Sequence, residues 1–134
     1  MEELPTARFV IEGSAVTGIP SFYDEINRVF MAGEDWRLGE SLDALNDLLY
    51  GGYGALPGGQ PAVIVWKDMD ASRAALGRGA TLALLRGRLP ERTIFNGSPI
   101  ASQIEDLEAG RGTTYFDIVM DIFADHPKIT VVPG

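Results

Sequence analysis

Cysteine is absent from this chain of 134 residues, and histidine occurs once. Without cysteine the chain has no disulfide, no thiol nucleophile and no Cys-ligated zinc site. The single histidine, His126, precedes Pro127 at the end of a predicted helix, where a cationic ring suits the helix dipole and a structural role is expected. No nucleophile, base and orienting acid can be assembled around it, so we expect no enzyme activity, no metal and no cofactor.

Long apolar runs and basic residues are also scarce. No stretch approaches the 18 or more apolar residues of a membrane span, and the acidic start of the chain lacks a signal-peptide pattern. We therefore expect a cytoplasmic protein without a membrane partner. The 11 basic residues against 19 acidic ones give a net charge of −8, which disfavours direct binding to nucleic acid. Such a charge suits a basic protein partner or serves solubility alone.

The apolar pattern predicts one small α/β domain over residues 1–134. Strands are expected at residues 8–11, 62–66 and 129–132, the second of them a continuous apolar run typical of a strand buried on both faces. Helices are expected at residues 20–32, 39–50, 68–76, 80–89, 100–107 and 115–124. Strands separated by helices predict parallel pairing. Asn96-Gly97 predicts a turn between the fourth and fifth helices.

The helix expected at residues 39–50 has one apolar and one acidic face. The apolar face carries Leu42, Leu45, Leu48 and Leu49, and the acidic face carries Glu40, Asp43 and Asp47 without any basic residue. Like charges at this spacing weaken a helix by roughly 0.2–0.5 kcal/mol per pair. Because folding alone does not call for these acids, we expect a binding surface for a positively charged partner.

Aromatic and glycine residues flank this helix. Trp36 and Tyr53 bracket it, and their side chains are either interface anchors or part of the core. Gly51 and Gly52 are expected to end the helix and to leave room for an approaching partner.

Two further groups of aspartates admit alternative interpretations. Asp117, Asp121 and Asp125 recur every four residues along the last helix, as a solvated face or as a second acidic surface. Asp68 and Asp70 follow an apolar strand, as in phosphatases that use Mg²⁺ and two aspartates, but helix capping is the favoured interpretation.

The run from Gly39 to Asp47 resembles the barstar family of ribonuclease inhibitors, above all in Leu42-Asp43-Ala44-Leu45 followed by Asp47. Supporting matches are residues 9–13, residues 63–66 and the final helix with its strand, residues 115–132. The resemblance covers about residues 7–77 and 113–133. It implies a two-layer domain in which a three-stranded parallel sheet packs against helices, with residues 78–112 as an insertion before the last helix.

The resemblance also implies a function. Members of the family act inside the cell as immunity proteins, binding a basic, secreted-type microbial ribonuclease through an acidic helix whose carboxylates stand where RNA phosphates would sit. Asp47 matches the principal carboxylate, Asp43 a second contact and Asp121 an auxiliary acid. The loop and first turn that meet the partner match Gly39, Ser41, Leu42 and Ala44.

Three departures from the family pattern bear on the choice of partner. Asn46 is expected at the partner surface and stands where the family usually carries Trp. Arg37-Leu38 replaces aromatic residues for which Trp36 substitutes in part. The insertion adds five basic and four acidic residues. The alternative function is therefore a barstar-like interaction domain whose partner is not a ribonuclease. The sequence leaves the oligomeric state open.

Overall fold

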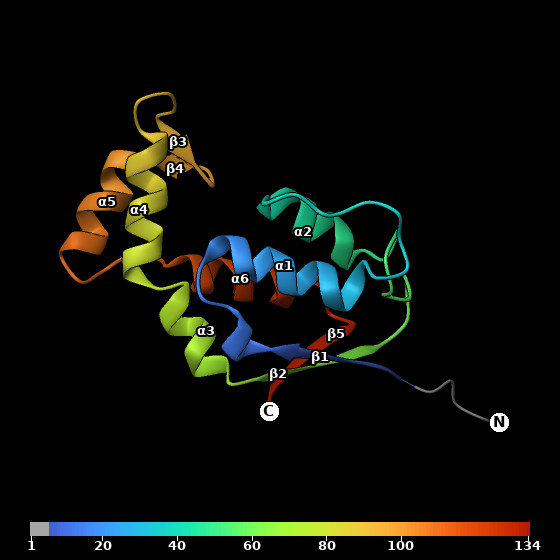
Figure 1. Ribbon diagram of the computed structural model, residues 1–134. Helices are drawn as coiled ribbons and strands as arrows, with labels where there is room; N and C mark the ends of the chain where they lie inside the picture. Colours follow the sequence, from blue (N-terminus) through green and yellow to red (C-terminus); the bar gives the residue numbers. More distant parts are fainter. Residues whose placement is uncertain (1–5) are drawn as a thin grey trace.

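A three-stranded parallel sheet forms the base of the molecule in the computed structural model, which describes residues 6–134 (Figure 1). Its strands are β1 (Ala7–Glu12), β2 (Ala62–Lys67) and β5 (Ile129–Pro133), in the order β1-β2-β5. The central strand β2 pairs with both neighbours, so that Ile64 lies between Phe9 and Val131. This position explains its apolar run and confirms the predicted α/β class. Residues 1–5 lie outside the described residues. They belong to the stretch from which the absence of a signal peptide was predicted.

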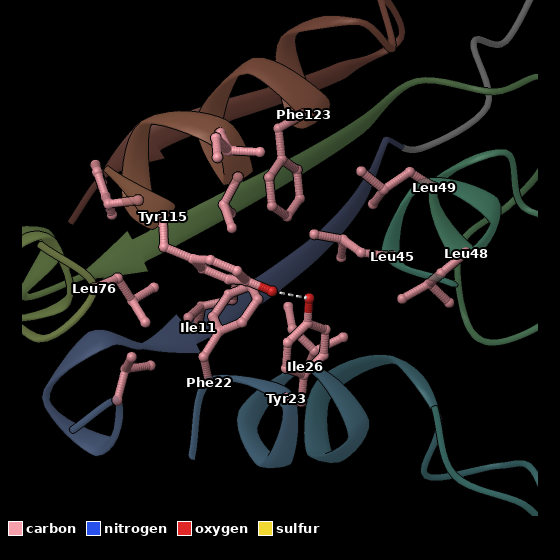
Figure 2. Packing of buried hydrophobic residues seen from close by; sticks show 14 of the residues in the cluster. Ile11, Phe22, Tyr23, Ile26, Leu45, Leu48, Leu49, Leu76, Tyr115 and Phe123 are labelled. Atoms are coloured by element: carbon pink, nitrogen blue, oxygen red, sulfur yellow. Dashed lines mark hydrogen bonds between the residues drawn. The ribbon is translucent and has the colours of Figure 1, made fainter. Parts of the chain in front are cut away.

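The helices α1 (Ile19–Phe30), α2 (Leu42–Leu49) and α6 (Tyr115–Ala124) form a second layer above the sheet (Figure 1). α1 lies along β1, α6 lies along β5, and α2 packs against α6. Figure 2 shows the apolar side chains that meet between the layers. Fully buried side chains come from all three helices and from the sheet: Ile11, Phe22, Ile26, Leu45, Leu48, Trp66 and Phe123.

A buried polar chain closes the end of the sheet where β1 and β2 finish. The Trp66 indole Nε1 donates to Ser72 Oγ at 2.9 Å, and this hydroxyl donates to the Gly13 carbonyl oxygen at 2.9 Å. Gly13 lies in the short 3-10 turn η1 (Gly13–Ala15), and Ser72 lies in α3 (Met69–Ala75). A side chain at position 13 would overlap the Lys67 carbonyl, so glycine is required for this close approach.

Residues 78–112 form a unit that stands beside the helical layer (Figure 1). The unit comprises α4 (Arg78–Arg88), the hairpin of β3 (Ile94–Phe95) with β4 (Ser98–Pro99), and α5 (Ile100–Glu108). The predicted turn at Asn96-Gly97 is confirmed, with φ of 51° and 81°. The pattern did not predict the two-residue strands around this turn, because they are too short to show a period.

The residues that precede α2 and α3 correct two expectations, one about where a helix begins and one about which side chain caps it. Ser41 has an extended backbone and its Oγ accepts a hydrogen bond from the Ala44 amide at 3.2 Å, so the acidic helix begins at Leu42 rather than at Gly39. Asp68 precedes α3, but its φ of 48° is left-handed and its side chain accepts no bond from the helix. The capping role predicted for Asp68 or Asp70 is therefore wrong, and Asp70 instead pairs with Arg73.

Two buried tyrosines join the first and last helices. The hydroxyls of Tyr23 and Tyr115 lie 2.6 Å apart, at the dashed line of Figure 2. Burial raises the pKa of both hydroxyls, which therefore stay neutral over the physiological range. The pair is a neutral hydrogen bond inside an apolar layer.

We expect Ser41→Ala to destabilise the protein by about 1 kcal/mol, because the Ala44 amide loses its acceptor at the start of α2. Hydrogen exchange should then quicken in the first turn of α2 before it quickens in α6. Equal exchange rates in the native and Ser41→Ala proteins would contradict the capping role.

We expect Tyr115→Phe to cost roughly 1–3 kcal/mol in urea unfolding, because the buried Tyr23 hydroxyl loses its partner. The double variant Tyr23→Phe, Tyr115→Phe should recover part of this loss, since no hydroxyl then remains without a partner. Strictly additive losses would show that the two hydroxyls do not interact.

Candidate functional site

The carboxylates of α2 point outward because its leucines point inward. Leu45 and Leu48 are fully buried and Leu49 nearly so, while Asp43 and Asp47 are exposed on the other side of the helix. Glu40 is exposed in the loop just before Ser41. Eight residues form this helix, and its buried side gives the acidic side a fixed orientation.

The three acids are not neutralised by the part of the chain that the structure describes. Six ion pairs occur in residues 6–134, and none of them involves Glu40, Asp43 or Asp47. Six other acids in this range are paired, as in Arg28 with Glu25 at 2.6 Å and Arg37 with Asp24 at 2.7 Å. The acidic side of α2 is thus a local excess of negative charge on a supported helix.

Tyr53 supports this surface from behind. Its hydroxyl donates to the Ala44 carbonyl oxygen at 3.2 Å, and its pKa is raised by burial and then by the nearby charge of Asp47. Trp36 packs on the Tyr53 ring with centroids 4.9 Å apart, yet 45% of Trp36 stays exposed. Tyr53 is therefore the more buried member of the pair, and Trp36 is the one available to a partner.

Gly51 ends the helix as expected, with φ of 82°. A side chain there would place its Cβ 2.5 Å from the Gly58 Cα, so the space beside Gly51 is filled by the chain's own loop. The structure thus gives Gly51 a packing role at the far end of α2.

Asn46 turns toward the scaffold. Its Oδ1 lies 2.8 Å from Nε2 of the buried His126, and the Tyr50 ring meets that imidazole edge-on with centroids 4.6 Å apart. The bond links α2 to the loop after α6. Sequence reasoning assigned Asn46 to the partner surface and gave His126 no partner, because 80 positions separate the two residues.

Asp121 lies apart from the groove beside α2 that Asp43 lines. It lines a different cavity of about 520 Å³ between α6 and residues 96–113, together with Gln103 and Asp106. Its auxiliary role at the partner surface stays a prediction, because Asp121 and Asp43 line different cavities.

A groove of about 500 Å³ separates the start of α2 from the 78–112 unit. One wall is residues 40–43, and Tyr115 also lines the groove. The other wall is made of Arg88, Arg92, Ile94, Phe95 and Asn96. Figure 1 shows the β3–β4 hairpin rising on the same side of the molecule as α2. Sequence reasoning missed this groove, because no local pattern indicates that residues 40–43 lie near residues 88–96.

Metal and membrane sites find no support in residues 6–134. No three His, Asp or Glu side chains in that range converge to hold a metal ion, and Asp68 and Asp70 lie at α3, away from α2 (Figure 1). Within the same range, no helix has both the length and the apolar character to cross a bilayer.

Comparison with known proteins identifies the fold family. The family model "Barstar (barnase inhibitor)" matches residues 6–88, which include α2, the flanking loops and α4. No curated protein matches the sequence. The match spans well over half of the chain and agrees with the three-stranded parallel sheet and the helices above it. The chain therefore belongs to the barstar family.

Proposed function

We propose that the protein is an intracellular inhibitor, an immunity protein, that blocks the basic active site of a secreted-type microbial ribonuclease with α2. The observation that carries the proposal is the set of three exposed acids, Glu40, Asp43 and Asp47, that have no ion-pair partner within residues 6–134. The family match includes this helix.

The mechanism is electrostatic and steric. Ribonuclease active sites bind phosphates with basic side chains, and carboxylates held on a supported helix occupy the same positions without a cleavable bond. Buried leucines and the Ser41 cap fix the helix before binding, so little conformational entropy is lost on association. The residues in contact with the partner would be Trp36, Gly39, Ser41, Leu42, Asp43, Ala44 and Asp47. No metal, cofactor or bond-breaking step is needed.

A non-ribonuclease partner is favoured by a different observation. Leu89 and Ile94 of the 78–112 unit are 40% and 60% exposed, so apolar surface is available to a partner on a unit that does not carry the acids of α2. If this unit alone captures the partner, Leu89→Ser with Ile94→Ser should abolish binding while Asp47→Ala leaves it intact.

We expect Asp47→Ala to weaken inhibition of barnase by roughly tenfold or more. This magnitude is taken from charge pairs measured in the barnase–barstar complex itself. The matched control is Glu105→Ala, which removes an exposed acid from α5 and the same charge. Inhibition constants from RNA cleavage, measured with both variants, provide the comparison. Equal constants for Asp47→Ala and the native protein would refute the proposed binding mode.

We also expect association with barnase to slow steeply as salt is added. The net charge of −8 attracts a basic enzyme, and the screening length falls from about 30 Å at 0.01 M to about 8 Å at 0.15 M ionic strength. Stopped-flow association rates should depend less on salt for Asp47→Ala than for the native protein. An association rate independent of salt would argue against electrostatic steering.

A further inference from the structure

The groove between α2 and the 78–112 unit holds unpaired charges of both signs. Glu40 and Asp43 line one wall, and Arg88 and Arg92 line the other. Within residues 6–134 no ion pair joins the two walls, since none of these four side chains has a charged partner within 4.0 Å. Opposite charges that face one groove without touching are available to something that enters it.

The other arginines of the 78–112 unit are already used internally. Arg78 donates to the Leu107 and Glu108 carbonyl oxygens at 2.6 and 3.0 Å. Arg86 pairs with Glu108 at 2.7 Å, and Arg111 pairs with Asp106 at 3.2 Å. The bonds of Arg78 and Arg86 join α4 to α5, and the Arg111 pair closes the end of α5. The arginines of the unit without such a bond are therefore Arg88 and Arg92, which line the groove.

The basic wall also has a defined shape. The Arg88 guanidinium lies over the Phe95 ring, 5.0 Å from its centroid, which restricts the side chain to one face of the hairpin. Ile94 lies on the same wall and is 60% exposed, so an apolar contact is available beside the cations. The wall therefore offers positive charge beside apolar surface, and arginine is one of the residue types enriched in protein interfaces.

The charges of both walls reach the tyrosine that also lines the groove. The pKa of Tyr115 is raised by burial, lowered by its bond to Tyr23 and by Arg88, and raised by Glu40. The opposite effects of Arg88 and Glu40 on this pKa agree with their positions on the two walls beside Tyr115.

We propose that this groove is a specificity filter, which accepts a protein segment carrying a basic side chain toward Glu40 and Asp43 and an acidic one toward Arg88 and Arg92. A partner that is basic over its whole contact surface is attracted by the acids at α2 but repelled by the two arginines. The inference rests on the proposed function, because it names the kind of ribonuclease surface that α2 would admit: a basic site with an acidic flank.

The test compares Arg92→Glu with Arg8→Glu. Both variants change the net charge from −8 to −10, and both replace exposed residues without ion pairs in residues 6–134, but Arg8 lies in β1 of the sheet. The probes are an octalysine peptide and a peptide of four lysines followed by four glutamates. Amide chemical shifts of residues 40–43 and of Asn96 report binding in the groove, and thermal unfolding checks the fold.

The expected result is a shift in the relative affinities of the groove for the two peptides. Arg92→Glu should raise the affinity of the groove for octalysine several-fold beyond the effect of Arg8→Glu, and it should lower the affinity for the mixed peptide. Equal effects of the two variants would overturn the inference, as would a mixed peptide that leaves the groove amides of the native protein unchanged at millimolar concentration.

The two proposals fail separately. No ribonuclease takes part in the peptide titrations, so the groove can fail as a filter while Asp47→Ala still weakens inhibition of barnase. Conversely, unchanged inhibition by Asp47→Ala would refute the binding mode of α2 even if the groove discriminates between the peptides.

Discussion

Burial of the α2 leucines is the constraint on which the rest of the surface depends. Leu45 and Leu48 are held in the layer between helices and sheet, and this fixes the rotation of α2 about its own axis. Once the rotation is fixed, Asp47 is exposed to solvent and Asp43 lines the groove beside the 78–112 unit. The same leucines that stabilise the fold therefore present the acids, and neither role can be changed without the other.

Much of the fold could be predicted from the sequence because its signals are local and periodic. The apolar run of β2, the stripe of α2 and the Asn96-Gly97 turn each identify an element from a few neighbouring residues. The predictions were wrong where the backbone conformation depends on the tertiary context. Asp68 has a left-handed backbone between β2 and α3 and so cannot act as the cap that its residue type indicates.

The candidate site was predictable only on the α2 side. Helical spacing predicts the acids, but the opposing wall comes from residues 88–96. No local pattern in either segment indicates that the two lie close together. The attachment of the 78–112 unit was equally hidden. Thr81 Oγ1 donates to the Gly77 carbonyl at 2.7 Å and accepts from the Tyr115 amide at 2.8 Å, so one hydroxyl fixes the start of α4 against the start of α6.

The bond between Asn46 and His126 has a consequence for how this protein could evolve. Family resemblance places an aromatic residue at position 46, whereas this chain commits Asn46 to a contact with the loop after α6. A substitution at position 46 would change the attachment of α2 to the loop after α6, and with it the support of the acids that the proposed function uses. Substitutions at exposed hairpin residues such as Ile94, which is 60% exposed, would change the surface offered to a partner without loosening α2. Adaptation would be expected to accumulate in the 78–112 unit while the interior face of α2 stays constant.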